Sequence, residues 1–390
     1  MPCDAEMPSP KLYSTRFLLI LSLQFVFGLA YSSFLLLPKY LTEAHGADAT
    51  TIGRIAAAAP LSAVLIMPLQ AVYIDRFRRH RLMLLSALTM LAATLGFVFS
   101  TELGIFIYVL RLLQGAAFSS FMANAATLVV EITPSERVGQ AIGLSGAANL
   151  VTNALGPGVA EPLAAGWGWR AVFVGSAIAA ACAALGSLAL GDVRTARPHA
   201  RATLRLGPPR RIALLFSALV AGLGFGAVIT FYQPLALSLG MGQVHALFIG
   251  YTLAALCVRV VFGAWLDRFD RRRLALVAAI LYPAVVLATA GLRPGWLFPL
   301  GVALGLAQGT LYPVVTALLF EDAEPDARGG LMTFFSGSFN LGVVLATIGL
   351  GALARLIGYP GIFVVASVAC ALGVPVLAAG LRRTAVVAAR

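Results

Sequence analysis

Two arginines interrupt long apolar segments of this chain and could bind an anion there. Arg111 begins Arg-Leu-Leu-Gln-Gly, and Arg259 lies in the apolar segment 245–266. A guanidinium in hydrocarbon costs from ~3 to over 10 kcal/mol, so it usually faces a cavity or a partner. All 16 acidic residues fall in expected loops, tails or helix ends. A positive cavity without an internal acid favours an anionic organic substrate, or a neutral one that bears a carboxylate or phosphate.

Both arginines also have a structural explanation. Arg111 lies about two helical turns from the expected start of its helix, so its side chain could extend to the outer membrane interface. Arg259 could be a helix-end cation paired with Glu321 or with a lipid headgroup. The sequence alone leaves these alternatives open.

Amides and phenols inside the apolar segments form the second set of candidates. Such groups need hydrogen-bond partners, and a water-filled cavity supplies them. Asn149 and Asn340 hold matched positions in an internal repeat, which indicates a cavity role or a shared bond between helices. The expected cavity-lining residues are Gln24, Tyr31, Asn124, Asn149, Asn153, Tyr232, Gln233, Gln308, Tyr312 and Asn340.

A charged turn occurs twice, at an offset of 192 residues. Ile74–Leu82 matches Leu266–Leu274, and each copy contains Asp-Arg-Phe followed by arginines. An aspartate at a helix end can accept hydrogen bonds from backbone N–H groups of a facing helix and from arginine. Positive charge beside membrane helices would explain the arginines, but not the matched aspartates. The residues that can form such contacts are Asp75, Arg76, Arg79, Asp267, Arg268 and Arg271 in the two turns, with Glu131 and Asp322 as expected partners of the arginines.

Long apolar segments must position these residues. Of the 390 residues, 60% are hydrophobic and 11% charged, against roughly 25% charged in soluble domains. A helix of about 20 apolar residues crosses ~30 Å of hydrocarbon. The sequence therefore predicts an all-α membrane protein with twelve transmembrane helices, at roughly 17–38, 51–74, 81–101, 104–131, 137–164, 168–191, 211–238, 245–266, 273–292, 295–320, 328–354 and 359–381.

The positive charges favour one side of the expected membrane. With a cytoplasmic N-terminus, 21 of the 28 Lys and Arg residues fall on the cytoplasmic side and five on the opposite side. This bias sets orientation, so both termini are expected in the cytoplasm of a multi-pass protein of the cell inner membrane. The net charge of +12 is then explained by loops beside anionic lipid rather than by nucleic-acid binding.

Further matches extend the repeat over two halves. Leu112–Gly115 corresponds to Leu306–Gly309, and other matches follow at offsets of 191 and 196. We expect an N-terminal six-helix bundle at 1–191, a cytoplasmic linker at 192–211 and a C-terminal six-helix bundle at 212–390, as parallel repeats. The chain has no ATP-binding loop or nucleophile triad, and its four cysteines show no paired spacing. No enzyme, cofactor or metal site is therefore expected.

With these features the chain resembles the major facilitator superfamily over nearly its whole length. The charged turn resembles the family's motif A, roughly Gly-x-x-x-Asp-Arg-x-Gly-Arg-Arg. The second copy keeps Gly263, the first has Ala71 there, and both lack the inner glycine. The resemblance implies two pseudo-symmetric bundles around a central site that opens to either side in turn. It also implies a latch that joins the halves on the cytoplasmic side in one state.

Two further motifs bear on transport. Arg111 and the residues after it resemble motif B, which implies a part in proton coupling, and its counterpart in the second half is Gly305. Asn153–Gly158 partly resembles motif C, the Gly-Pro signature of antiporters, although Ala160 and Glu161 replace the glycines that should follow. A helix kink with close packing would produce a similar pattern.

Taken together, the residues and the resemblance predict a secondary active transporter that moves a small organic molecule across the inner membrane by alternating access. Proton-coupled efflux is favoured. Proton-coupled uptake of an organic anion and a non-transporting membrane sensor are the alternatives. The expected partners are a small-molecule substrate with anionic character, protons and membrane lipid, without nucleic acid, and the expected state is a monomer.

Overall fold

The first half of the molecule is a bundle of tilted helices. The structure is a computed structural model and describes residues 13–73, 78–100, 102–191, 209–260, 269–321, 323–324 and 327–387. Its elements up to residue 191 are α1 (Thr15–Ser32), η1 (Ser33–Leu36), α2 (Leu37–His45), α3 (Ala49–Tyr73), α4 (Arg79–Phe99), α5 (Ile105–Ile132), η2 (Ser135–Arg137), α6 (Val138–Trp167) and α7 (Trp169–Ala189).

Local signals place the ends of these helices. The Ser14 hydroxyl caps α1 by accepting a hydrogen bond from Phe17 N. Gly46 ends α2 with φ 58°, and Gly168 separates α6 from α7 with φ 82°. Glycine adopts this left-handed backbone without steric cost, so both turns suit the residue. The first expected span is therefore built from α1, η1 and α2 together.

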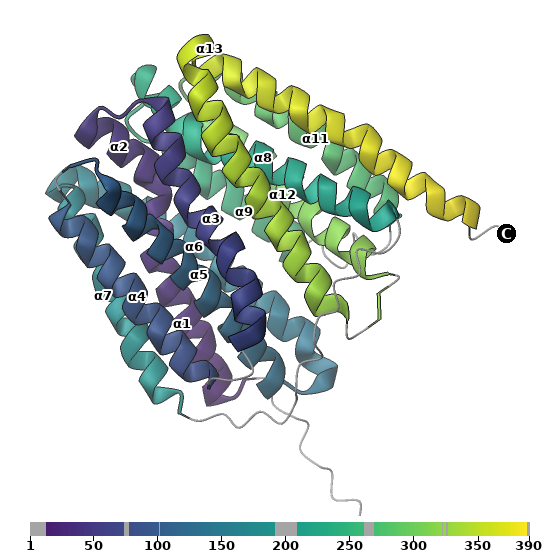
Figure 1. Ribbon diagram of the computed structural model, residues 1–390, viewed down its shortest axis with the longest axis horizontal. Helices are drawn as coiled ribbons and strands as arrows, with labels where there is room; N and C mark the ends of the chain where they lie inside the picture. Colours follow the sequence, from purple (N-terminus) through teal and green to yellow (C-terminus); the bar gives the residue numbers. More distant parts are fainter. Residues whose placement is uncertain are drawn as a thin grey trace, which may run out of the picture.

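The second half repeats this arrangement. Its helices are α8 (Pro209–Ser238), α9 (Ala246–Val260), α11 (Arg271–Ala290), α12 (Leu297–Phe320) and α13 (Arg328–Val387). The α8 helix begins at Pro209, two residues before the expected span, because proline suits the first helical turn. The last three residues of the expected linker are thus helical. The last two expected spans form α13, which bends at Gly358 (φ 70°), so that its two arms diverge (Figure 1).

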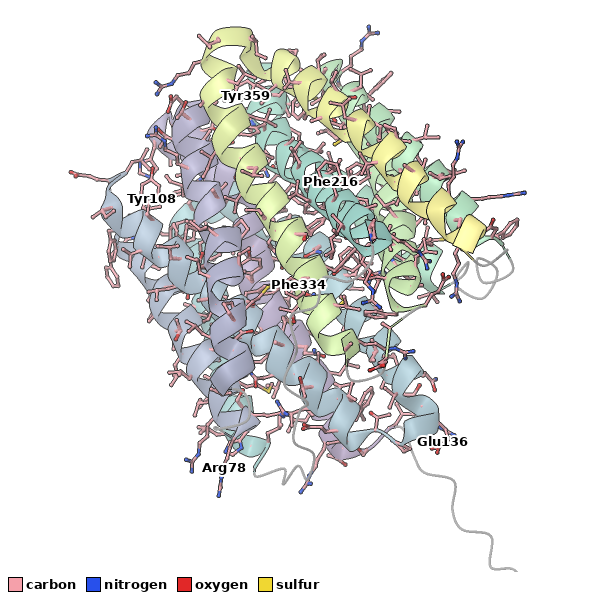
Figure 2. All side chains as sticks on the ribbon, turned by 45° about the vertical axis from the view of Figure 1, so that its right-hand side comes forward. Arg78, Tyr108, Glu136, Phe216, Phe334 and Tyr359 are labelled. Atoms are coloured by element: carbon pink, nitrogen blue, oxygen red, sulfur yellow. The ribbon has the colours of Figure 1, made fainter. Side chains whose placement is uncertain are left out.

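Each of the twelve expected ranges contains helix among its described residues. Within the described residues, nine helices are long and apolar enough to cross a membrane. Large apolar side chains such as Leu185, Val277 and Leu372 are more than half exposed on the outside, as expected for helices that contact lipid. Figure 2 shows Arg78 and Glu136 at one end of the helices, with Tyr108 and Tyr359 toward the other.

Buried apolar side chains fill both halves and the contact between them. In the first half, Phe17, Phe27 and Phe121 are buried together with small residues of α4 and α7. The largest cluster lies mainly in the second half, with Tyr282 and Phe363, and extends to Leu150 and Val172 of the first half. The halves contact each other mainly through α3 against α13 and α6 against α9, and α3 and α13 lie side by side in Figure 1. These two contacts enclose the candidate site.

Candidate functional site

A cavity of about 270 Å³ lies between the two halves. Small-molecule sites commonly have volumes of ~300–1,000 Å³, so this cavity is near the lower end of that range. Its wall combines an arginine with amide, hydroxyl and aromatic side chains from both halves. The polar members are Tyr31, Arg111, Asn149, Asn153, Thr230, Tyr251, Asn340 and Thr347.

Arg111 supplies positive charge to this wall. It lies on α5 and is only 6% exposed. Its Nη1 donates to Gln114 Oε1 at 2.7 Å, and its guanidinium carbon lies 6.0 Å from the centre of the Tyr31 ring. Its Nε is buried without a hydrogen-bond partner in the described part of the chain. The side chain thus lies in the cavity wall rather than at the outer interface.

Aromatic rings from both halves form the apolar part of the wall. Tyr31 stacks on Phe118 with ring centres 4.0 Å apart. Across the cavity, Phe225 contacts Tyr251 and Phe339 at 5.9 and 5.6 Å. Flat apolar surfaces next to a guanidinium suit a molecule with both an apolar body and a negative group.

The structure divides the ten predicted cavity residues into three groups. Tyr31, Asn149, Asn153 and Asn340 line the cavity, and Asn340 Nδ2 also donates to Ser336 O at 2.9 Å. Gln308 and Tyr312 instead line a small pocket within the second half. The matched asparagines Asn149 and Asn340 thus lie in the same wall, as their repeat positions suggested.

The remaining predicted cavity residues are buried away from this wall and bonded within the protein. Gln24 Oε1 accepts from Ser145 Oγ at 2.8 Å, and Asn124 Nδ2 donates to the Ser120 carbonyl in its own helix at 2.8 Å. The Tyr232 hydroxyl donates to Val244 O at 3.0 Å. In this form these three side chains thus do not line the cavity, and each has a hydrogen-bond partner within the protein.

Gln233 is also buried away from the cavity and joins the two halves. Its Nε2 donates to Leu35 O at 2.8 Å, and its Oε1 accepts from Lys39 N at 3.1 Å. In this form the Gln233 amide does not line the cavity. It instead bonds to backbone groups of Leu35 and Lys39, at the junction of η1 and α2.

Arg259 lies outside the cavity wall, on the side of the charged turns. It is exposed on α9 and reaches toward α6, where its Nη1 is 3.4 Å from the position that a Cβ on Gly146 would take. The alternative partner Glu321 contacts Arg210 and lies 3.9 Å from Arg271. Arg259 therefore sits between the halves.

The charged turns carry ion pairs inside each half. Arg79 donates a fork to the Glu131 carboxylate, from Nε at 3.0 and 3.1 Å and from Nη2 at 2.7 Å. Both side chains are nearly buried. In the second half Glu321, next to the predicted Asp322, is the partner of Arg271. Five predicted latch residues lie outside the described residues: Asp75, Arg76, Asp267, Arg268 and Asp322.

Hydrogen bonds between the halves concentrate at the opposite end of the molecule. Thr50 Oγ1 donates to Gly351 O at 3.0 Å, and Arg355 Nε donates to Asp48 at 2.7 Å. Glu161 bonds to the segment before α9. The sequence analysis treated Glu161 only as a departure from a motif, because no local signal marked its distant partners. These contacts close the cavity toward that end.

Two packed helical halves surround an amphipathic cavity, an arrangement typical of membrane transporters. Comparison with known proteins agrees with this class. The sequence model of the Major Facilitator Superfamily matches residues 19–212 and 214–389, and the chain belongs to this family. The predicted family and fold class are thereby confirmed.

Relatives and solved structures give the same family context. The chain is 26% identical to the multi-drug resistance efflux pump PmrA of Streptococcus pneumoniae, over 80% of this chain and 81% of that protein. It is 24% identical to the multidrug resistance protein MdtG of Enterobacter lignolyticus, over 92% and 90%. The crystal structures of the nucleoside transporter NupG and the human organic anion transporter MFSD10 superpose with TM-scores of 0.73 and 0.69. NupG is 13% identical and MFSD10 is 17% identical to this chain. Each superposition covers 94% of this chain, together with 99% of NupG and 100% of MFSD10, and so supports the fold.

Proposed function

We propose that this protein exports a small amphipathic organic molecule with anionic character by proton-coupled alternating access. The cavity between the halves, with Arg111 buried in its wall, is the observation that carries the proposal. Similarity to proteins named as multidrug efflux pumps supports export. We place the protein in the cell inner membrane as a monomer, with both termini in the cytoplasm, on the bias of its positive loops.

The substrate class follows from the cavity chemistry. The Arg111 guanidinium in the cavity wall offers positive charge to a carboxylate or phosphate. Phe118 and Phe225 offer apolar surface on opposite sides, and the asparagines 149, 153 and 340 offer amide groups. A molecule with an apolar ring and an acidic group would satisfy all three features.

The form seen here is then inward-facing. On the proposed orientation, the bonded end with Thr50, Asp48 and Glu161 is external, and the charged turns are cytoplasmic. Arg79 and Arg271 hold carboxylates of their own halves in this form. We propose that the latch residues 75–76, 267–268 and 322, which lie outside the described residues, join the halves when the cytoplasmic side closes.

Flux measurements in proteoliposomes test this function. Protein reconstituted with a panel of amphipathic aromatic acids should drive substrate movement that depends on an imposed pH gradient. Collapse of the gradient with a protonophore should abolish accumulation. Flux that is insensitive to the proton gradient would remove the coupling claim, and absence of flux for every substrate would favour a membrane sensor.

Uptake of an organic anion is the second candidate. It is favoured by Glu161, which stands where the antiporter motif requires glycine, and by the lack of an acid in the cavity wall within the described residues. The direction of the proton gradient that drives accumulation distinguishes the two functions. Export requires protons to move opposite to the substrate, whereas uptake requires them to move with it.

A further inference from the structure

A buried carboxylate joins the halves at the end that is closed. Glu161 lies on α6 of the first half and is 4% exposed. Its Oε1 accepts from Val244 N at 2.9 Å, and its Oε2 accepts from His245 N at 2.8 Å. The His245 ring and Lys39 Nζ also contact this carboxylate. Four donors therefore surround one carboxylate, which is about as many as its lone pairs can accept.

Lys39 holds the same segment of the second half from a second direction. It is 6% exposed, and its Nζ also contacts the Gly242 carbonyl. Glu43, one turn later, lies 3.5 Å from this Nζ. The Tyr232 hydroxyl donates to Val244 O at 3.0 Å and fixes the segment from the side of α8. The chain from 242 to 245 is thus held by charged side chains of the opposite half.

The halves cannot separate at this end while these contacts persist. Three of the four donors to Glu161 belong to residues 244 and 245 of the other half. Hydrogen bonds to an ionised carboxylate are roughly twice as strong as neutral ones. Burial also prevents water from replacing the donors before the contact breaks. Separation of the halves at this end therefore requires Glu161 to lose its contacts with residues 244 and 245 together.

A second ion pair at the same end provides a built-in comparison. Asp48 precedes α3 and contacts Arg355 of α13, as His245 precedes α9 and contacts Glu161 of α6. The side chains of Asp48 and Arg355 are 40% and 64% exposed. Exposed pairs contribute little, because water competes for both charges. The two pairs thus differ in burial while serving equivalent helix contacts.

We propose that Glu161 is the electrostatic lock of the external gate. Its ionised carboxylate holds the externally closed form together, and a neutral side chain in its place shifts the population toward the externally open form. Glu161 acts as a positioning residue, through Lys39 and the segment 242–245, rather than by contact with substrate. The inference rests on the proposed alternating access, and it gives a role to the residue at which this chain departs from the Gly-Pro motif.

Distance measurement by pulsed electron paramagnetic resonance tests the lock directly. Spin labels are placed at Trp167 of the first half and Leu239 of the second, which are 81% and 46% exposed. The four native cysteines are replaced, and the protein is held in lipid nanodiscs. Glu161→Gln should raise the ratio of long to short distances about tenfold, since the amide cannot accept from all four donors. Asp48→Asn, the matched control, should change it less than about twofold.

Further variants and a flux assay make each outcome decisive. Glu161→Asp keeps the charge and should lie between wild type and Glu161→Gln. If Glu161→Gln fails to fold, His245→Gln removes the ring contact but keeps the backbone donor, and should shift the ratio in the same direction. An unchanged ratio in folded Glu161→Gln, or an equal shift in Asp48→Asn, overturns the lock. Substrate flux by the same labelled protein would leave alternating access standing, whereas absence of flux would remove the proposed function as well.

Discussion

Arg111 illustrates how much the chemistry of the cavity depends on a single side chain. Gln114 satisfies one of its nitrogens, and the Tyr31 ring lies beside the guanidinium. Its Nε is enclosed without a hydrogen-bond partner among the described residues. The guanidinium still places a positive charge in the cavity wall, and this charge favours an anionic substrate.

Replacement of Arg111 should weaken transport of anionic substrates. Arg111→Gln removes a charge-assisted hydrogen bond worth about 1.5–3 kcal/mol, which corresponds to about 10–100-fold in apparent affinity. Arg111→Lys should recover little, because an ammonium lacks the planar fork. Concentration-dependent flux in proteoliposomes measures both.

Two other arginines serve as controls for this prediction. Arg170→Gln, at an exposed site on α7, should leave the apparent affinity unchanged. Arg259→Gln should reduce transport less than Arg111→Gln, since Arg259 lies outside the cavity wall. The anion hypothesis would be contradicted if neither Arg111→Gln nor Arg259→Gln altered the transport of any recognised substrate.

The exposed ion pair of Asp48 and Arg355 has a predictable dependence on pH. A hydrogen bond from the Thr51 hydroxyl, supported by Arg355 and by Thr51 N, lowers the pKa of the Asp48 carboxyl from 3.8 to about 2. Because this pKa is lowered on folding, the pair's contribution is complete above pH 3.8 and is lost as the pH falls toward 2. Between pH 5 and 8, thermal melting of wild type and Asp48→Asn should therefore change in parallel. Divergence of the two melting curves within that range would contradict this assignment.

At the scale of elements, ion pairs connect the ends of neighbouring helices. Arg79 begins α4 and Glu131 lies near the end of α5, with side-chain exposures of only 6% and 11%. The forked geometry aligns the two helices where the charged turn leaves the membrane. Removal of one partner leaves the other charge buried without compensation.

Glu131→Gln should therefore destabilise the first half. The expected loss is about 3–5 kcal/mol, the usual cost of breaking a buried pair from one side. Removal of both charges, in Arg79→Gln with Glu131→Gln, should recover part of it. Glu321→Gln is the comparison in the second half and should cost less, because Glu321 is 33% exposed. Chemical denaturation in detergent micelles measures these differences, and equal losses for Glu131→Gln and the double variant would contradict the pairing.

At the scale of the whole molecule, the two halves approach most closely at the closed end. A Cβ on Gly53 of α3 would lie 2.1 Å from the Thr347 carbonyl oxygen of α13. Real Cβ atoms do not approach a backbone oxygen so closely, and a packed interface transmits the resulting strain. Gly53 thus permits contact between the halves.

Gly53→Ala should wedge the halves apart at this end. The population of the externally open form should rise, as read from the Trp167 and Leu239 spin labels. Gly349→Ala is the matched control, since a Cβ there meets no atom within 4 Å. Unchanged spin-label distances and thermal stability in Gly53→Ala would show that the helices accommodate the methyl group without separating. That result would contradict the prediction.

The sequence by itself determined the helical spans, the repeat and the expected orientation of this protein. Hydrocarbon forces about 20 apolar residues into each crossing helix, and the repeat of Ile74–Leu82 at Leu266–Leu274 is visible without coordinates. Gly358 could also be recognised as a helix break, because its position between apolar segments is local information. Each of these signals is carried by residues close together in the chain.

Only the tertiary structure decided which polar groups face the cavity and which join the halves. Asn149 and Gln233 look alike in sequence, yet one lines the cavity and the other bonds to Leu35 and Lys39. Glu161 meets its partners across 122 residues to Lys39 and 84 to His245. A helical segment of nearly uniform hydrophobicity does not reveal which of its faces meets a neighbour. The packing of distant helices therefore selects, from many polar residues, the few that carry charge into the cavity or across the gate.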